Sequence, residues 1–388
     1  MKILFFNYEY PPLGGGAANA AFCILREFAK NPDLEIDLVT SSVDSEYHLE
    51  KMGENVRVHR LPIGKNSRNL HFQSQKDLLV YTWEAYWFSK KLILEAGDNG
   101  YDATHSFFTV PCGYLSYRFK KKFGIPYIIS LRGSDVPGYS DRFMFIYDIL
   151  KPLIVKIWKS AGSVISNSMG LRELALESSP DQEIGVIHNG VNIEQFKPDE
   201  KRKNPQEFVI TPGGSRITAR KGLKYLVEAV SELVPDHPHI RLRIMGEGNE
   251  SENLKNLVRE LKLEKNIEFL GRFSHEDIVP RYQEADLFVL PSLNEGMSNA
   301  MLEALATGLP IVTTNTGGAS ELVRPGENGF IVGFENSHDI AEKIKLIMDD
   351  NNLRESMSRK SLEMSKEMSW QTVAEKYAGE YEKITRQK

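Results

Sequence analysis

The stretch LFVLPSLNEGMSNAMLEALA, residues 287–306, decides the fold class. Its first four residues, Leu287 to Leu290, are apolar and have the length of a buried strand, which Pro291 ends. A polar loop with one glycine follows, and a helix is expected to begin near Ser298. A strand that leads through such a loop into a helix is the repeating unit of a parallel sheet with crossover helices.

The same alternation of short apolar runs and helix-length amphipathic segments occurs along both halves of the chain. In the first half we expect strands at residues 2–7, 35–40, 56–61, 103–107, 126–131 and 163–167. In the second half we expect strands at residues 208–211, 240–245, 267–270, 287–290, 311–314 and 329–332. Each set is sufficient for its own doubly wound sheet, so the predicted fold class is α/β.

Chain length agrees with two domains, because 388 residues exceed one ordinary core of roughly 100 to 200 residues. The polar segment 193–206 contains two prolines and a run of charges, which is typical of a connection between domains. We place an N-terminal domain at residues 1–190 and a C-terminal domain at residues 191–365. Two domains imply a cleft.

Composition excludes several classes of protein. No apolar run approaches the ~20 residues that a membrane span requires. The net charge of −5 argues against a dedicated nucleic-acid binder, so no nucleic-acid partner is expected. Two cysteines, Cys23 and Cys112, fit a reducing compartment better than a disulfide scaffold, and the first residues indicate a core strand rather than a signal peptide. We therefore expect a cytoplasmic protein.

Ligands of doubly wound sheets bind at loops that follow the carboxyl ends of the strands. The first such loop ends in three glycines, Gly14, Gly15 and Gly16, just before a helix that begins near Ala17. Glycine backbone N–H groups at a helix N-terminus suit a phosphate or a sugar hydroxyl. The alternative is a tight turn that needs glycine for its backbone geometry alone.

A second loop, which follows the strand at 208–211, combines glycine with positive charge. It contains Gly213, Gly214, Ser215 and Arg216, and Lys221 follows where the next helix begins. A guanidinium fork, a lysine ammonium and glycine N–H groups together neutralise a diphosphate well. The alternative is ordinary basicity at the start of a helix, and one of the three cations, which include Arg220, is expected to be a solvated surface charge.

Two carboxylates lie in the quoted stretch itself. Glu295 belongs to the loop, and Glu303 lies about two turns into the helix, so the two side chains cannot share one turn. Two carboxylates at different depths suit two parts of one ligand, a transferred sugar and a ribose diol. A solvent-facing helix position is the alternative for Glu303. A further glycine loop at Gly317 and Gly318 follows the next strand and adds N–H donors at the same edge.

These residues resemble glycosyltransferase family 4, a large retaining group with the GT-B fold, over nearly the whole chain. The most specific match is the pair Glu295 and Glu303 together with the upstream Arg216 and Lys221. Supporting matches are the Pro-Pro-x-Gly-Gly loop at 11–15, Asp102-x-x-His105, Arg132-Gly133-Ser134-Asp135, Ile187-His188-Asn189-Gly190-Val191, and Gly317-Gly318 with Glu321. The resemblance implies two Rossmann-like domains that face each other across a cleft, with a last helix at 366–388 packed back on the N-terminal domain.

The resemblance also implies roles for individual residues. The residues implied in catalysis are Glu295, Arg216, Lys221 and Arg132. Those implied in donor binding are Gly15, Gly16, Gly214, Arg216, Lys221, Gly296, Met297, Ser298, Asn299, Glu303, Gly317 and Gly318. Those implied on the acceptor side are Gly14, Tyr10, His105 and Asp135.

The implied reaction transfers a hexose from a nucleotide-sugar, with a UDP-sugar favoured and GDP-mannose second. The acceptor is a glycan, a lipid-linked compound or a small molecule in surface polysaccharide or glycolipid biosynthesis. No Asp-x-Asp occurs in the chain, so neither a metal nor another cofactor is expected, and cationic side chains replace the metal. The expected oligomeric state is a monomer or homodimer.

Arg132 departs from the family pattern, because many members have a histidine before the glycine that is Gly133 here. An arginine cannot exchange a proton at neutral pH, so it acts only as a fixed cation. The charge suits a phosphate, an anionic acceptor or an anionic sugar. The alternative is an ion pair with Asp135 that holds the loop.

Basic and aromatic residues of the N-terminal domain have the composition of a membrane-interface patch. The clusters are Arg118, Lys120, Lys121 and Lys122 with Phe119 and Phe123, and Lys151, Lys156 and Lys159 with Trp158. They predict peripheral contact with the inner face of the membrane, and solvated basic faces are the alternative. The aromatic residues Tyr81, Trp83, Tyr86, Trp87 and Phe88 precede Lys90 and Lys91 and have the same composition, although aromatic residues at this spacing are more often part of the core.

Three other functions share parts of this pattern. A GT-B sugar-nucleotide epimerase has the same architecture and needs no acceptor. A non-catalytic subunit would bind nucleotide and stabilise a partner, although every donor-side residue is present here. A glycan phosphorylase is excluded, because it needs a far longer chain and a pyridoxal-phosphate lysine site.

Overall fold

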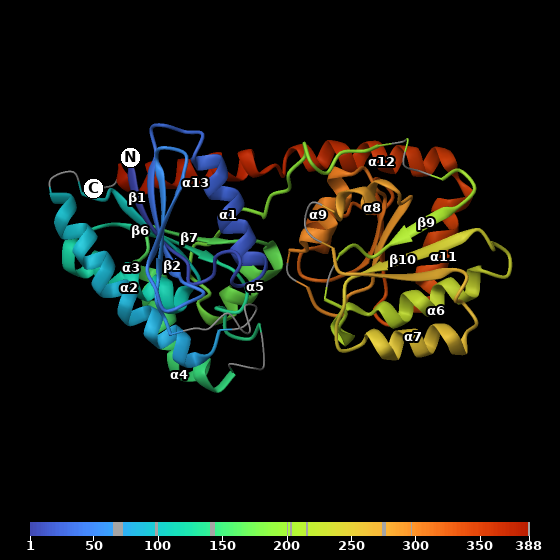
Figure 1. Cartoon of the computed structure of the whole chain (residues 1–388), viewed down its shortest axis with the longest axis horizontal. Helices are drawn as coiled ribbons and strands as arrows, with labels where there is room; N and C mark the ends of the chain where they lie inside the picture. Colours follow the sequence, from blue (N-terminus) through green and yellow to red (C-terminus); the bar gives the residue numbers. More distant parts are fainter. Residues whose placement is uncertain are drawn as a thin grey trace. The chain divides into compact units, whose positions relative to one another are not determined.

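A computed structural model describes residues 1–64, 73–97, 100–139, 144–199, 201, 204–214, 216–273, 277–295 and 297–386, without the side chains of 144–148. The chain divides into two compact units (Figure 1). Unit 1 comprises Met1–Asn189 and Trp370–Lys388, and unit 2 comprises Gly190–Ser369. The division lies one residue before the predicted boundary, and the chain returns to unit 1 at Trp370, four residues after the predicted start of the last segment.

Unit 1 contains an eight-stranded sheet in the order β3-β4-β2-β1-β5-β6-β7-β8. Every pairing is parallel except that of the edge strand β3 with β4. The strands are β1 (Lys2–Phe6), β2 (Glu35–Ser41), β3 (His48–Met52), β4 (Val56–Leu61), β5 (Ala103–Phe107), β6 (Tyr127–Leu131), β7 (Ser163–Ser166) and β8 (Gly185–Val186).

The helices of unit 1 cover both faces of this sheet. They are α1 (Gly16–Phe28), α2 (Gln75–Ala96), α3 (Tyr114–Phe123), α4 (Met144–Ser160), α5 (Met169–Ser178) and α13 (Trp370–Thr385). Helices α1 and α13 contact each other, and α3 contacts both α2 and α4. Right-handed crossovers place α1 on one face and α2, α3 and α4 on the other, because the chain moves in opposite directions along the sheet.

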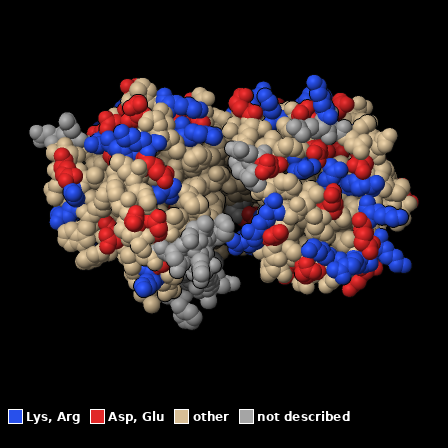
Figure 2. Space-filling model, in the orientation of Figure 1, with Lys and Arg blue, Asp and Glu red and all other residues tan. Residues whose placement is uncertain are grey.

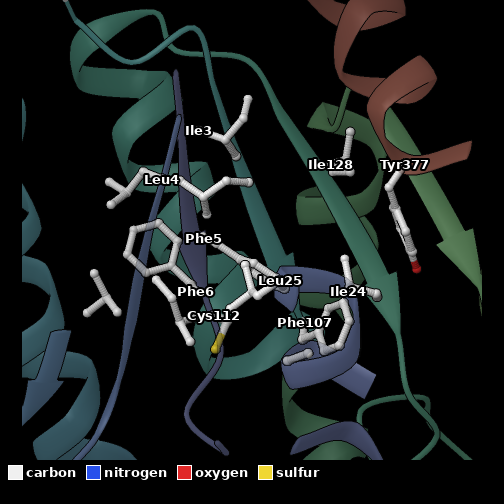
Figure 3. Packing of buried hydrophobic residues seen from close by; sticks show 14 of the residues in the cluster. Ile3, Leu4, Phe5, Phe6, Ile24, Leu25, Phe107, Cys112, Ile128 and Tyr377 are labelled. Atoms are coloured by element: carbon white, nitrogen blue, oxygen red, sulfur yellow. The ribbon is translucent and has the colours of Figure 1, made fainter. Parts of the chain in front are cut away.

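The core of unit 1 explains why its strand β1 is apolar from Ile3 to Phe6. Strand β1 is buried on both faces, and Figure 3 shows its residues Ile3 to Phe6 in one cluster with Ile24 and Leu25 of helix α1 and Phe107 of β5. Helix α13 belongs to this core, because Tyr377 and Tyr381 are 1% and 0% exposed. A Cβ added at Gly162 would lie 2.8 Å from Ile384, so α13 also closes tightly over the start of β7.

Unit 2 contains a six-stranded, wholly parallel sheet in the order β11-β10-β9-β12-β13-β14. Its strands are β9 (Phe208–Thr211), β10 (Ile240–Met245), β11 (Ile267–Gly271), β12 (Leu287–Leu290), β13 (Ile311–Thr314) and β14 (Gly329–Val332). Its helices are α6 (Leu223–Leu233), α7 (Ser251–Glu260), α8 (Val279–Gln283), α9 (Asn299–Ala306), α10 (Ala319–Leu322), α11 (Ser337–Asp349) and α12 (Asn351–Lys366).

The observed strands include every strand predicted from the sequence, with ends that differ by at most one residue. The sequence missed β3 and β8. The predicted connection at 193–206 is tied to unit 2, because Phe196 is 1% exposed and packs edge-on against Tyr282 at 5.7 Å. Phe196 therefore anchors the first part of this segment, together with the Lys197 carbonyl, which accepts a hydrogen bond from Gln283 at 2.8 Å.

Aromatic residues of unit 1 correct the predicted interface patch. Phe119 and Trp158 are both 0% exposed and belong to the core, whereas Trp83 and Trp87 are 64% and 47% exposed.

Cys23 and Cys112 are free thiols, both buried. Within the described ranges, no helix combines the length and the apolar character needed to cross a bilayer. Figure 2 shows Lys and Arg mixed with Asp and Glu over the visible face of unit 2.

Candidate active site

The strand order of unit 2 reverses between β9 and β12. From β9 the chain proceeds outward through β10 to β11, and it then crosses back to β12 and proceeds outward to β14. Ligands of open parallel sheets bind in the crevice at such a reversal, beyond the carboxyl ends of the strands. The loops that follow β9 and β12 carry Lys221 and Glu295, so these two residues, which the sequence analysis singled out, lie at the crevice.

Backbone contacts hold these two loops together. Gly222 has φ +64, and a Cβ added there would lie 2.0 Å from the carbonyl oxygen of Pro291. The Leu293 N–H donates to the carbonyl of Arg220 at 2.8 Å. Only glycine fits position 222, because any side chain would collide with the neighbouring loop.

Lys221 and Glu295 form an ion pair across the crevice, with Nζ 2.5 Å from Oε1. Their side chains are only 12% and 14% exposed, so the pair is partly shielded from water. An ammonium group has three N–H donors, and one carboxylate oxygen occupies one of them. Glu295 therefore fixes the position of Lys221 and leaves donors for a second anion.

Arg216 lies in the same loop, and its side chain is exposed. Within the described ranges it has no ion pair or hydrogen bond. The next residue is held in place, because the Ile217 N–H donates to the carbonyl of Glu247 at 3.1 Å. A Cβ added at Gly248 would lie 1.9 Å from the carbonyl oxygen of Ile217. The backbone next to Arg216 is thus held in place, while the Arg216 side chain itself extends into solvent. Arg220 is exposed as well, and Ser215 lies outside the described residues.

Glu303 lies in the second turn of α9, and its side chain contacts Tyr282 of α8. Its Oε2 accepts a hydrogen bond of 2.6 Å from the hydroxyl of Tyr282, which is 0% exposed. Burial raises the pKa of Glu303 to about 7, although the Tyr282 hydrogen bond acts in the opposite direction. The solvent-facing alternative for Glu303 is therefore wrong.

The loop after β13 supports the Glu295 loop and does not offer all of its N–H groups to a ligand. The Gly317 N–H donates to the carbonyl of Glu295 at 2.9 Å. The Thr314 hydroxyl donates to the carbonyl of Ser292. We expected the Gly317 N–H to contact the donor. Its bond to the Glu295 carbonyl uses this N–H, so that expectation is corrected. Gly318 is buried at the N-cap of α10.

The helix predicted to begin near Ser298 has Ser298 as its N-cap, and α9 starts at Asn299. Met297 and Ser298 are 8% and 4% exposed. Backbone N–H groups of the first helical turn lack partners within the helix, so this end of α9 suits an anion or sugar hydroxyls. Gly296 lies outside the described residues.

Unit 1 has its own reversal of strand order, between β1 and β5. After β1, Gly15 is the N-cap of α1, and both Gly15 and Gly16 are exposed. A Cβ added at Gly15 would meet nothing within 4 Å, so its surroundings are open. Gly14 has φ +92 and lies against Glu9, so it serves the turn itself.

Two expected acceptor-side residues lie in the core of unit 1. His105 is 0% exposed, and its ring nitrogens are 2.7 Å from the Tyr381 hydroxyl and 2.8 Å from the Ser130 hydroxyl. Tyr10 is 2% exposed, with the Arg60 guanidinium 5.1 Å from its ring centre. Neither side chain can touch an acceptor directly, so this assignment is corrected to a structural one.

Asp135 holds the loop after β6 through hydrogen bonds and not through an ion pair with the Arg132 side chain. Its carboxylate accepts hydrogen bonds from the N–H groups of Thr109, Arg132 and Gly133 and from the Thr109 hydroxyl. The Arg132 guanidinium instead donates to Asn189 at 2.8 Å and lies 3.5 Å from the Phe107 ring centre. The proposed pairing of the Arg132 side chain with Asp135 is therefore wrong, and Asp135 at 1% exposure is structural.

A pocket of about 260 Å³ opens at the reversal in unit 1. Its walls come from the loops after β1, β5 and β6 and from the first turns of α2. Most of the lining is apolar, and Gln75, Ser134 and Asp135 are among its polar residues. The other lining residues are Tyr8, Leu78, Leu79, Thr82, Val110, Pro111 and Leu150.

Several site residues were missed by sequence reasoning. The loop Gly246-Glu247-Gly248 follows β10 and clamps the Arg216 loop, and its position after a predicted strand was the available signal. Tyr282 carries no such signal, because it meets Glu303 only through the tertiary fold. Asn189 lies in the motif at residues 187–191, but its hydrogen bond with Arg132 was not predicted.

Comparisons with known proteins agree with this architecture. The family model for group 1 glycosyl transferases matches residues 192–364, and the model for Glycosyltransferase Family 4 matches residues 14–195. An uncharacterised glycosyltransferase of Methanocaldococcus jannaschii is 26% identical over 99% of each chain.

Solved structures extend the agreement to the fold. Sucrose-phosphate synthase from Thermosynechococcus elongatus matches with a TM-score of 0.81 at 20% identity over 100% of each chain. Anabaena HepE in complex with UDP matches with a TM-score of 0.71 at 19% identity, over 98% of this chain and 99% of its own. The predicted GT-B fold class, two Rossmann-like parallel-sheet domains, is confirmed. The chain belongs to glycosyltransferase family 4, the group 1 glycosyl transferases.

Proposed function

We propose that this protein is a retaining hexosyltransferase that uses a nucleotide-sugar donor, with UDP-sugars first and GDP-mannose second. The observation that carries the proposal is the Lys221–Glu295 pair at the strand reversal of unit 2, with the exposed Arg216 in the same loop. The preference for uridine draws support from the UDP and UDP-glucose complexes of Anabaena HepE.

The diphosphate, the ribose and the hexose of the donor each have a partner in this crevice. Lys221 and Arg216 bind the diphosphate, because their N–H donors match its oxygens. The Glu303 carboxylate accepts hydrogen bonds from the ribose hydroxyls. Glu295 contacts the transferred hexose while it positions Lys221.

In the proposed front-face reaction, the bond between the sugar C1 and the diphosphate oxygen breaks as a bond forms from C1 to the acceptor oxygen. The acceptor proton passes to the departing diphosphate, so no protein nucleophile is required. Lys221 and Arg216 stabilise the negative charge that grows on the leaving group. Because these cations supply that charge, the reaction needs no bridging metal.

The acceptor is proposed to bind unit 1 at the pocket beside β1 and β5. Its apolar walls and the polar groups of Gln75 and Ser134 fit a molecule with an apolar portion and hydroxyl groups, such as a lipid-linked sugar. Arg132, which is held by Asn189 and Phe107, acts as a fixed cation toward an anionic group of the donor or the acceptor.

The test is incubation of the protein with UDP-glucose and GDP-mannose against alkyl-glycoside acceptors, with and without EDTA. Proton NMR of the product identifies the anomeric configuration. We expect an α-linked product that forms equally well with EDTA. A β-linked product would contradict the retaining mechanism. Interconversion of nucleotide sugars without acceptor would favour the epimerase, and nucleotide binding without turnover would favour the non-catalytic subunit.

Donor affinity is expected to depend on pH through Glu303. Its pKa of about 7 means that the carboxyl is partly protonated at neutral pH, and only the carboxylate accepts hydrogen bonds from both ribose hydroxyls. The affinity for UDP should therefore rise as pH is raised through about 7. Titration of UDP into wild type and Glu303→Gln measures this, because the variant retains only the titration of the phosphate itself. Identical pH profiles would contradict the assigned role.

A further inference from the structure

Helix α2 presents large apolar side chains to solvent along one face. Leu79, Trp83 and Trp87 are spaced four residues apart and are 72%, 64% and 47% exposed. Leu94 continues the row and is 61% exposed. These four residues are termed the outer ridge of α2. The opposite side of the helix, with Tyr81 and Ala85 at 0% exposure, packs on the sheet, so the ridge is not part of the core.

Helices next to the ridge carry a strong positive charge. Residues 114–123 of α3 contain four Lys or Arg, and residues 149–160 of α4 contain three, while neither segment contains Asp or Glu. The whole chain has a net charge of −5, so this concentration is local. The residues are Arg118, Lys120, Lys121, Lys122, Lys151, Lys156 and Lys159.

The ridge is linked to Arg118 through Tyr86, and it contacts a further cation, Lys90, directly. The Trp87 ring lies 5.4 Å from the Tyr86 ring, and the Arg118 guanidinium lies 5.6 Å from the same Tyr86 ring. Lys90 lies 4.6 Å from the Trp87 ring centre. The ridge is therefore continuous with the basic side of α3.

A groove of about 430 Å³ between α3 and α4 extends this surface. Lys121, Lys156 and Lys159 line it, together with Tyr117, Pro152, Val155 and Ser160. Three ammonium groups around one groove form a receptor for anionic head groups. The outer ridge of α2 and this groove belong to one helix layer, because α3 contacts both α2 and α4.

We propose that the outer ridge of α2 and the lysine groove form one face that docks on an anionic lipid bilayer. Tryptophan is favoured at the membrane interface, where its apolar ring and its N–H are both accommodated. Lysines attract anionic lipids, whereas interfaces between proteins are depleted in lysine. This pattern of aromatic and basic residues therefore fits a lipid surface better than a protein partner.

The position of the face agrees with the pocket in unit 1. Leu79 belongs to the ridge and also lines that pocket. Docking would therefore place the mouth of the pocket at the lipid surface, where a lipid-linked acceptor is presented. The docking proposal itself stands on the exposed ridge and the charges, and it holds whether or not the chain transfers a sugar.

Tryptophan fluorescence offers a direct readout. The chain has four tryptophans, and Trp158 and Trp370 are 0% and 5% exposed. A blue shift on addition of vesicles therefore reports Trp83 and Trp87. We expect the full-length protein to co-sediment with phosphatidylcholine vesicles that contain phosphatidylglycerol, with a blue shift, and to dissociate at high salt.

Two variants separate the apolar and electrostatic parts of the face. W83A/W87A should weaken vesicle partitioning at least about tenfold, because it removes both inserted rings. K121E/K156E should weaken it by about fivefold or more for each lysine. Matched controls in unit 2 are Phe334→Ala, where Phe334 is 49% exposed, and Lys265→Glu at another exposed site. Both controls should bind as wild type does.

Three results would overturn the proposal. The first is no binding to phosphatidylglycerol vesicles above that to phosphatidylcholine alone. The second is binding that W83A/W87A leaves unchanged. The third is self-association in size-exclusion chromatography that W83A/W87A abolishes without any vesicle binding, which would make the face a contact between copies. Thermal stabilisation by UDP, measured in each variant, verifies folding and tests the donor site separately.

Discussion

Lys221→Ala is expected to lower kcat for sugar transfer by about a hundredfold to a thousandfold. The side chain is the less exposed cation of the crevice, and its ammonium is held in place by Glu295 at 2.5 Å. Its removal takes away a preorganised donor to the leaving group and leaves the Glu295 carboxylate uncompensated beside the diphosphate. UDP release from a UDP-sugar in the presence of acceptor measures the loss.

The matched control is Lys224→Ala in the following helix. Lys224 is 62% exposed, and its nearest acidic partner, Glu228, is 3.7 Å away. An exposed pair of this kind contributes little, so the control should retain wild-type kcat and stability. Equal rates for Lys221→Ala and Lys224→Ala would remove Lys221 from the catalytic machinery.

Asp37→Ala is expected to reduce the free energy of unfolding by about 3 kcal/mol. Asp37 lies in β2 and is 2% exposed. Its carboxylate accepts hydrogen bonds from Arg57 at 2.6 Å and from the Tyr101 hydroxyl at 2.7 Å, and His59 lies 2.8 Å away. The loss falls at the lower end of the usual range for a broken buried pair, because the Arg57 side chain is 36% exposed.

The same group predicts the behaviour of the protein in acid. Burial alone would raise the pKa of Asp37, but hydrogen bonds from His59, Arg57 and Tyr101 hold it below its ordinary value. The contribution of Asp37 to the free energy of unfolding is complete at pH values above its pKa in the unfolded chain, which is about 4. This contribution is lost as the pH falls toward the lower pKa of Asp37 in the folded protein. Urea denaturation at neutral and acidic pH measures both effects. Asp33→Ala, at an exposed position, is the control. An equal change in the free energy of unfolding in both variants would contradict the role given to Asp37.

Sequence patterns predicted the strands well, because parallel strands buried on both faces are short, continuous apolar runs. Strand β3 has the sequence HLEKM, and its Glu50 and Lys51 are exposed, so it lacks that signal. It forms because β4 offers an unpaired edge. Strand β8 has only two residues, Gly185 and Val186, which is too short for any periodicity.

Prediction of position succeeded where loops at neighbouring strand ends carry the residues, as at Lys221 and Glu295, whose side chains meet, while the roles assigned to them stay proposals. It failed where tertiary packing decides the direction of a side chain. His105 follows the family pattern, yet both of its ring nitrogens face partners within the core. Trp83 has the spacing of a core residue, yet the face of α2 that carries it points away from the sheet. Burial of this kind depends on which helix face meets the sheet, and local sequence does not encode it.

Calorimetric titration of UDP into the full-length protein in the presence of EDTA tests the donor site most directly. Arg216 and Lys221 supply the charge at the crevice of unit 2, so we predict binding that is insensitive to EDTA. The Kd should be at least about tenfold weaker in Lys221→Ala, as expected for the loss of a charged hydrogen bond. A folded protein that binds no UDP, or binding that is the same in wild type and Lys221→Ala, would contradict the assignment of this crevice as the donor site.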